Sequence, residues 1–133
     1  MIYLTQKKLS SIDGTIKGDC FRTCIACLLD IKDQDDLPSF EDMTNGEWII
    51  PFVKTLNSYG YQFNGCNKFE DIIVDKSFKG VDGYYIVGGK SPREWVKAGH
   101  ATIYKDGKLV WDPHPSRDGI LKEEEVYLIE KDE

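Results

Sequence analysis

The sequence predicts an α+β fold built as a single domain over residues 1–133, and three observations support this prediction. The amphipathic, helix-like segments lie in the first half of the chain. Short aromatic and β-branched runs separated by glycine-rich turns follow in the second half, as in an antiparallel sheet. The length is that of one ordinary domain, and a hydrophobic content of 41% is enough for a core. We therefore expect two layers, with helices packed on one antiparallel sheet.

The chain begins with an extended segment and a loop. Ile2 and Leu4 fall on one face of residues 1–6, which predicts a short strand or an extended arm. Residues 10–18 are polar and contain two glycines, so we expect a loop there.

The first helix is predicted over residues 20–29. Its apolar side chains form one broad stripe, which consists of Cys20, Cys24, Ile25, Cys27, Leu28 and Leu29. A helix with this pattern buries its stripe in the core. Residues 30–40 end the helix, and residues 37–40 are predicted to be an extended, packed turn.

A second helix is predicted from Asn45, a residue type that caps helices, to Gly60, a residue type that stops them. Pro51 falls inside this span, so the helix is either kinked there or starts near Ile50. The buried face is predicted to consist of Trp48, Phe52, Val53 and Leu56.

Five short runs are predicted to be the strands of one antiparallel sheet. They span residues 61–63, 84–87, 100–104, 108–111 and 126–129. Glycine-rich residues 65–67 and 88–91 are expected to form a mobile rim over any cleft beside the sheet.

Composition limits the classes of partner. The chain has 17 basic and 23 acidic residues, a net charge of −6, so a basic surface for nucleic acid is not expected. No apolar run approaches the roughly 20 residues that span a bilayer. Residues 1–8 do not resemble a signal peptide, because the apolar stretch is short and lysines follow it. We therefore expect a cytoplasmic protein without a membrane partner, in which the four cysteines stay reduced.

Gly18-Asp19-Cys20 places a cysteine in the first turn of the predicted buried helix. The positive end of the helix dipole favours thiolate over thiol there, which is how many cysteine nucleophiles are activated. An inert buried cysteine is the alternative interpretation of Cys20. Cys24 and Cys27 are predicted to be core residues, and Cys66 a surface thiol.

A thiol nucleophile needs a neighbouring base. The chain has two histidines. His100 begins a predicted strand, which would fix the direction of its ring, so we take it as the base. His114 lies between two prolines in a turn and is predicted to be a turn residue that lines the groove.

The hairpin that follows His100 suggests a third group. Asp106 and Gly107 close it as a two-residue loop or, together with Lys105, as a three-residue loop. The two-residue loop would put His100 and Asp112 on opposite faces. The three-residue loop puts them directly opposite each other on one face, with Cβ atoms ~5 Å apart. It also gathers Ala101, Ile103, Leu109 and Trp111 on the other face, so we favour it. Periodicity thus predicts a Cys20–His100–Asp112 triad.

A zinc site is the competing interpretation of the cysteines. Cys20, Cys24 and Cys27 with one histidine would supply the ligands of a Cys₃His site. Three sulfurs on one helix converge poorly, and the chain has no second cysteine pair. We therefore expect neither a metal nor another cofactor.

Three motifs, Gly18-Asp19-Cys20, Gly99-His100-Ala101 and Trp111-Asp112-Pro113, resemble those of the papain-like cysteine peptidase superfamily. More narrowly, they resemble its small bacterial and phage members related to the C39 type. The resemblance covers residues 18–29 and 85–119. It implies a papain-like fold, in which the N-terminal helix carries the nucleophile and packs on the sheet. It also implies Cys20 as nucleophile, His100 as general base and acid, and Asp112 as orienter.

The superfamily completes its site with an oxyanion hole made by the nucleophile's backbone N–H and an upstream glutamine side chain. Residues 15–19 contain no glutamine, and Gln6 is the only one upstream of Cys20. Gln6 would serve only if the loop at residues 10–18 folds back. Asp19 is expected to cap the helix instead.

The resemblance supports two classes of function. The first is a cysteine hydrolase, a monomer that acts on a protein or peptide substrate by peptide or isopeptide cleavage, deamidation or transamidation. The second is a catalytically weak or inactive binding module, phage-encoded, that occupies a host protein. The lack of a glutamine close to Cys20 favours the second class.

Overall fold

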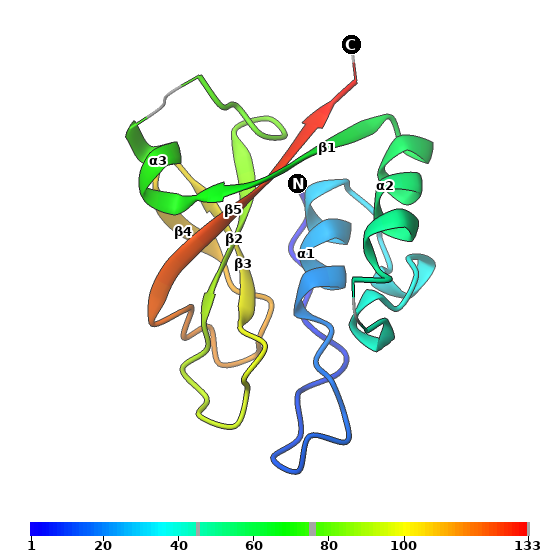
Figure 1. Cartoon of the computed structure of the whole chain (residues 1–133), viewed down its shortest axis with the longest axis vertical. Coiled ribbons are helices and arrows are strands. Elements are labelled where there is room, and N and C mark those ends of the chain that lie inside the picture. The colour runs from blue at the N-terminus through cyan, green and yellow to red at the C-terminus, as the bar shows by residue number, and fades with distance from the viewer. Residues whose placement is uncertain (45, 75–76, 133) are drawn as a thin grey trace.

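The computed structural model describes residues 1–44, 46–74 and 77–132. It has the predicted α+β class: helices pack against one antiparallel sheet, whose strand order is β1-β5-β2-β3-β4. Helix α1 (Cys20–Leu28) lies between this sheet and helix α2 (Ile49–Ser58) (Figure 1). A third, short helix, α3 (Phe69–Val74), packs against the edge strand β1 and its neighbour β5.

The five predicted runs all lie in strands, and most of the strands extend beyond them. Their bounds are β1 Tyr61–Lys68, β2 Tyr84–Lys90, β3 His100–Lys105, β4 Lys108–Trp111 and β5 Lys122–Lys131. All pair antiparallel. Periodicity did not predict α3 or the two 3₁₀ turns, Gln34–Asp36 and Phe40–Asp42, because each is too short to show a helical repeat.

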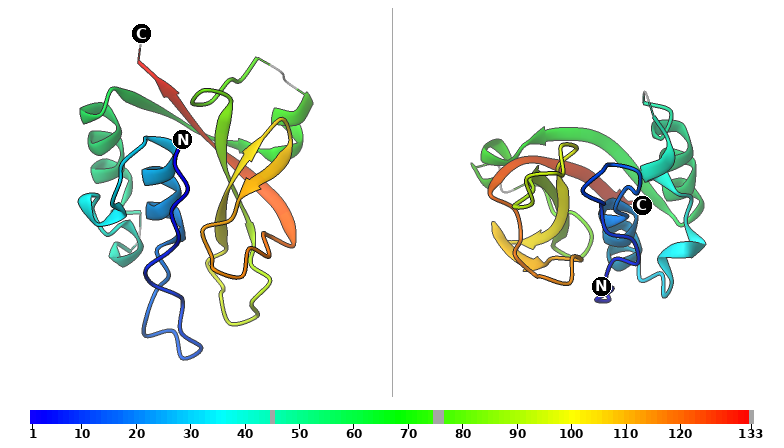
Figure 2. Two further views of the ribbon diagram at one scale, coloured as in Figure 1. Left: turned by 180° about the vertical axis from the view of Figure 1, so that it is seen from behind. Right: turned by 90° about the horizontal axis from the view of Figure 1, so that it is seen from below.

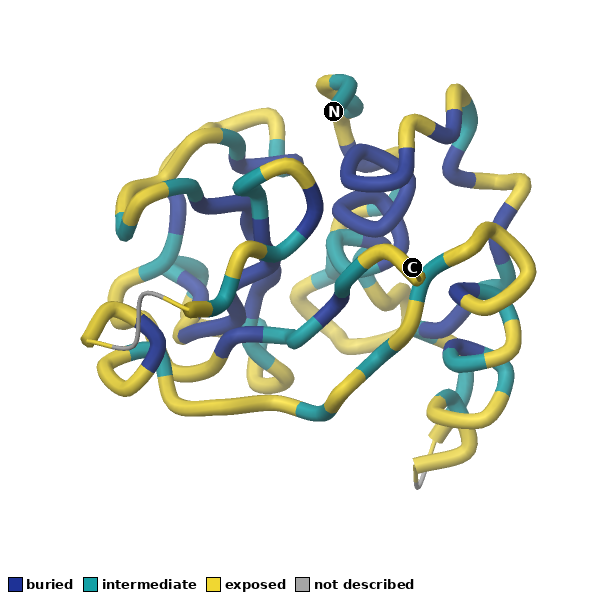
Figure 3. Tube along the Cα trace, turned by 90° about the horizontal axis from the view of Figure 1, so that it is seen from above, coloured by how far each residue is buried: buried dark blue, intermediate teal, exposed yellow. Residues whose placement is uncertain are grey.

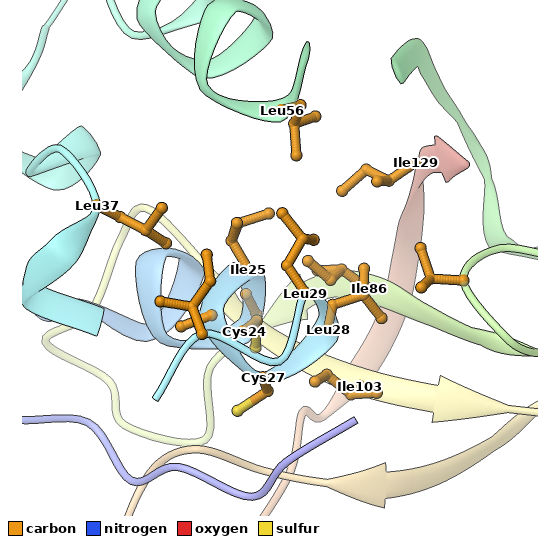
Figure 4. Packing of buried hydrophobic residues seen from close by; sticks show 14 of the residues in the cluster. Cys24, Ile25, Cys27, Leu28, Leu29, Leu37, Leu56, Ile86, Ile103 and Ile129 are labelled. Carbon is orange, nitrogen blue, oxygen red and sulfur yellow. The ribbon is translucent and has the colours of Figure 1, made fainter. Parts of the chain in front are cut away.

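The core lies around α1. Of its residues, the last seven are buried, and the helix appears as the main buried segment in Figure 3. In Figure 4, side chains of α1 such as Ile25 and Leu28 lie between Leu56 of α2 and the sheet residues Ile86 and Ile103. Cys24 and Cys27 are 0% exposed, which confirms their prediction as core residues, and Cys66 is exposed as predicted.

Helix α2 starts at Ile49, so the second of the two predicted alternatives is the observed one. Pro51 is the third residue of the helix, where its missing N–H has no partner to lose within the helix. Gly60 ends the helix with a positive φ of 86°, as predicted. Asn45, the predicted cap, lies outside the described residues.

The hairpin register differs from the one we favoured. Asp106 and Gly107, with φ of 53° and 77°, form a two-residue turn that pairs Lys105 with Lys108. A β-bulge then leaves Val110 as an extra residue, so that Trp111 pairs with Ile103. The prediction of a three-residue loop was wrong. It shifted the strand pairing by one residue in the turn, whereas the structure makes this shift with the bulge at Val110. Leu109, predicted on the apolar face, is 42% exposed.

The prediction of a mobile glycine-rich rim is also wrong, because both segments lie largely within strands. Gly88, Gly89 and Lys90 belong to β2, and residues 65–67 belong to β1. A Cβ on Gly89 would clash with the carbonyl oxygen of Lys122, where the pairing of β2 with β5 shifts. Gly89 therefore allows the neighbouring strand β5 to approach closely, and it is not part of a mobile loop.

The N-terminal segment is an extended arm rather than a strand, the second of the two predicted options. It runs beside α1, as the blue trace in Figure 2 shows. The Ile2 N–H donates to the Cys27 carbonyl over 3.1 Å, and the Trp111 indole N–H donates to the Leu4 carbonyl over 2.8 Å. The arm is thereby fixed between α1 and β4. None of the described helices is long and apolar enough to cross a membrane.

Candidate active site

Three packed elements bring the predicted triad together. Cys20 is the first residue of α1, His100 is the first residue of β3, and Asp112 follows the last residue of β4. Helix α1 packs directly on β3. His100 Nε2 lies 2.6 Å from Asp112 Oδ1, and His100 lines the same two cavities as Cys20. The ring nitrogen left for Cys20 is Nδ1, because Asp112 occupies Nε2.

The acid is rigidly held. Asp112 is 2% exposed, and besides His100 its Oδ1 accepts the His114 N–H over 2.9 Å. Its Oδ2 accepts the Gly119 N–H over 2.7 Å. Burial raises the pKa of Asp112, but these hydrogen bonds outweigh burial and hold the pKa below its usual value. A carboxylate held in this way keeps the imidazole in one orientation.

The histidine is protonated well above neutral pH. Burial by itself lowers the pKa of His100, but the hydrogen bonds to Asp112 and Cys20 and the charges of both residues raise it to about 9. His100 therefore carries a proton near neutral pH, next to the sulfur on one side and the carboxylate on the other.

Gln6 reaches the same place. It lines a small cavity of about 20 Å³ together with Cys20 and His100. Its Nε2 donates to the Lys8 carbonyl over 3.0 Å, and its backbone N–H donates to the Pro113 carbonyl over 2.8 Å. Gln6 is 9% exposed, and no described residue donates to its Oε1. The loop thus folds back in the way that an oxyanion role for Gln6 requires.

Asp19 does not cap α1 with its side chain, which corrects the prediction made for it. Its Oδ1 instead accepts the Lys8 N–H over 3.1 Å, and its own N–H donates to the Lys8 carbonyl over 3.3 Å. The residue before Cys20 therefore holds the segment that carries Gln6.

Arg22 is a buried charge that the sequence analysis missed. It is 5% exposed, and its guanidinium lies 3.6 Å from Asp19, 3.5 Å from Asp35 and 3.3 Å from Glu41. Burial raises the pKa of Glu41 although the charge of Arg22 opposes this effect. The only sign of these ion pairs in the sequence was the run of acidic residues that follows the helix. The position of an arginine in the helical repeat does not by itself distinguish a buried side chain from an exposed one.

His114 lines the small cavity with Cys20, in agreement with its prediction as a groove residue. Its Nδ1 accepts the Ser116 N–H over 3.0 Å, so Nδ1 is unprotonated. Burial and the nearby charge of Arg93 lower the pKa of His114. Both effects favour the neutral form of His114, whereas the pKa of His100 is shifted in the opposite direction.

Two further cavities border the site. One of about 130 Å³ is lined by Cys20, His100 and the acidic residues Glu124 and Glu125. Its neighbour, of about 280 Å³, shares Glu124 and includes three basic residues, Lys90, Arg93 and Lys97. The Trp95 indole, 41% exposed, donates to the Ser10 carbonyl over 3.1 Å, so it anchors the loop before β3 to the loop before α1.

Within the described ranges, no group of three or more histidine, cysteine or acidic side chains is arranged to hold a metal ion. A cavity of about 490 Å³ lies elsewhere, between α3 and the β3–β4 turn. Its described lining residues include neither histidine nor cysteine.

No family model matches this chain, and neither a curated protein nor a solved structure matches it. The likeness to papain-like peptidases therefore remains a resemblance of motifs.

Proposed function

We propose that this protein is a papain-like cysteine hydrolase that works through a thioester acyl-enzyme. The observation that carries the proposal is that Cys20 and His100 line one cavity of about 130 Å³ and that His100 is hydrogen-bonded to Asp112. Nucleophile, base and orienter come from three separate elements and occur in the chain order that the resemblance implies. An arrangement of this kind is recognised by geometry and roles rather than by position in the sequence.

In the proposed reaction the Cys20 thiolate attacks the substrate carbonyl carbon, and a C–S bond forms as the carbonyl oxygen becomes an oxyanion. The C–N bond then breaks, and protonated His100 gives its proton to the leaving amine. Neutral His100 next takes a proton from water, which attacks the thioester and releases the acid and Cys20. Asp112 keeps the imidazole in place throughout.

The oxyanion would be stabilised by two donors. The Cys20 backbone N–H is among the first four of α1, which have no partner within the helix. The Gln6 amide has a second N–H beyond the one given to Lys8. Since Gln6 lines the same small cavity as Cys20, this pair supports an oxyanion hole.

The substrate we propose is a peptide or isopeptide bond of a protein, with glutamine deamidation or transamidation as close chemical relatives. These reactions share the acyl-enzyme and differ in the leaving group and in the acceptor. The binding module proposed as the second class loses its main support, because Gln6 lies beside Cys20 in space despite its distance in sequence.

The test uses the full chain, the Cys20→Ala variant and, as a matched control, Cys66→Ser, which removes an exposed thiol that lines neither cavity beside Cys20. Each is incubated with a library of peptide and isopeptide substrates. New amino termini report hydrolysis, and released ammonia reports deamidation. We expect turnover by the wild type and by Cys66→Ser, and none by Cys20→Ala. Turnover by Cys20→Ala would overturn the assignment, and a stoichiometric complex without turnover by the wild type would favour the binding module.

A further inference from the structure

The Gln6 side chain lies far along the chain from Cys20, and the segment between them contains a long exposed loop. A flexible connection does not by itself fix a side chain, because ordering it costs conformational entropy. Catalytic groups nevertheless need accurate placement, since an error of ~1 Å can cost ~100-fold in rate. Some contact near the end of this segment must therefore set the position of Gln6.

That contact is a pair of reciprocal hydrogen bonds between Asp19 and Lys8. The Lys8 N–H donates to Asp19 Oδ1 over 3.1 Å, and the Asp19 N–H donates to the Lys8 carbonyl over 3.3 Å. The same Lys8 carbonyl accepts the Gln6 Nε2 over 3.0 Å. One carbonyl oxygen thus connects the backbone beside the nucleophile to the amide of Gln6.

The Asp19 carboxylate is well placed for this role. It is 0% exposed, it makes no capping hydrogen bond to α1, and its Oδ2 faces the guanidinium of Arg22 at 3.6 Å. Burying a carboxylate that neither caps the helix nor contacts solvent costs free energy unless other groups donate hydrogen bonds to it or pair with its charge. Its contacts with Lys8 and Arg22 are the ones the structure gives it.

Gly18 provides an independent sign that the arrangement is tight. A Cβ at this position would lie 2.9 Å from Ser10 Oγ and 3.2 Å from Gln6 Nε2. The arm that carries Gln6 therefore packs directly on the backbone that precedes Asp19 and leaves no room for a side chain.

We propose that Asp19 is a positioning residue for the proposed oxyanion donor: its carboxylate fixes the Lys8 backbone, and the Lys8 carbonyl fixes the Gln6 amide. This inference rests on the proposed cysteine hydrolase function. It predicts that the loss of Asp19 impairs reactions that develop an oxyanion and spares those that do not.

Two reagents separate these cases on the same sulfur. Acylation by p-nitrophenyl acetate passes through a tetrahedral oxyanion, whereas alkylation by iodoacetamide displaces iodide at a saturated carbon. Both rates are measured at Cys20 by peptide mass spectrometry. We expect Asp19→Ala to lower the acylation rate ~10- to 100-fold and to change the alkylation rate by less than ~3-fold. Equal losses in both rates, or no loss in acylation, would overturn the proposal.

Three further variants sharpen the test. Asp19→Asn keeps an acceptor for the Lys8 N–H and is expected to stay within ~3-fold of the wild-type acylation rate, so a loss as large as in Asp19→Ala would contradict the role assigned to Lys8. Gly18→Ala is expected to impair acylation selectively without any change at Asp19. Lys7→Ala, the matched control, removes exposed ion pairs to Asp33 and Asp35 on the same arm and is expected to change neither rate.

A double-mutant cycle gives the decisive comparison. In a Gln6→Ala background, Asp19→Ala is expected to have little further effect on acylation, because its partner is already lost. Full additivity of the two losses would show that Asp19 does not act through Gln6. Absence of any acylation at Cys20 in the wild type would instead refute the proposed function itself, so the two failures are distinct.

Discussion

Asp112 Oδ1 accepts a hydrogen bond of 2.6 Å from His100 Nε2 although the two residues are not opposite each other in the hairpin. The last pair of the ladder joins Ile103 to Trp111, and extending this register places Asp112 across from Thr102. His100 and Thr102 share a face because side chains alternate along a strand. The contact is therefore diagonal, and the β-bulge at Val110 puts Asp112 on the correct face.

The two histidines should titrate far apart. Burial lowers the pKa of His100, but Asp112 and Cys20 raise it to about 9, whereas burial and Arg93 lower that of His114 below 6.5. An NMR titration of the two imidazole C–H signals, assigned with His114→Gln, measures both values. Cys20→Ala and Asp112→Asn should each lower the upper midpoint. Two midpoints close to 6.5 would contradict this account of the site.

Asp112→Asn should impair catalysis more than folding. An amide at this position no longer stabilises the imidazolium, and its NH₂ group can face the ring nitrogen that should donate. We expect the acylation rate at Cys20 to fall by ~10²- to 10⁴-fold. Asp118→Asn is the control, since Asp118 is exposed in the same loop. The assigned role would be wrong if the two variants had equal acylation rates.

The raised pKa of His100 also links stability to pH. Because its folded pKa of about 9 exceeds the ordinary histidine pKa of 6.5, its contribution is fully present below pH 6.5 and is lost as pH rises through about 9. The shift corresponds to ~3 kcal/mol. Urea unfolding of wild type and His100→Gln should show a free-energy gap that narrows between these pH values. A gap that is constant or widens would disprove the linkage.

Phe52 tests the packing of the helical layer. It is 0% exposed and its ring contacts Phe21 of α1 and Phe63 of β1, with centroids 5.3 Å and 4.9 Å apart. Phe52→Ala should lower the free energy of unfolding by ~3–5 kcal/mol, because it leaves a cavity where three elements meet. Ile50→Ala, in the same helix but 67% exposed, is the control and should cost much less. Similar losses in both variants would argue against this packing.

The elements with a clear period were predictable from the sequence. The stripe that includes Cys24 and Cys27 predicted a buried helix, and the β-branched and aromatic runs predicted all five strands. The contact between His100 and Asp112 was also predicted, but from the wrong register. Trp111, which follows the bulge, donates to the Leu4 carbonyl of the N-terminal arm, and no local pattern in the strand records this long-range contact.

The parts that could not be predicted depend on long-range folding. Gln6 reaches Cys20 only because the loop returns and is fixed by Asp19, and the spacing of the sequence carries no sign of this return. Arg22 looks like a solvated residue until the acidic segment that covers it is placed. The contacts of Gln6 and Arg22 both join segments that are distant in the sequence, so the hydrophobic repeat within one segment does not predict them.

The most direct test of the central claim is to trap the acyl-enzyme. Wild type, Cys20→Ala and Cys66→Ser are mixed with p-nitrophenyl acetate, quenched in acid within the burst, and analysed by intact-protein and peptide mass spectrometry. The proposed mechanism predicts one acetyl group on Cys20 in the wild type and in Cys66→Ser, formed together with a burst of p-nitrophenolate, and no burst in Cys20→Ala. A burst that persists in Cys20→Ala, or a wild type that never acetylates Cys20, would contradict it.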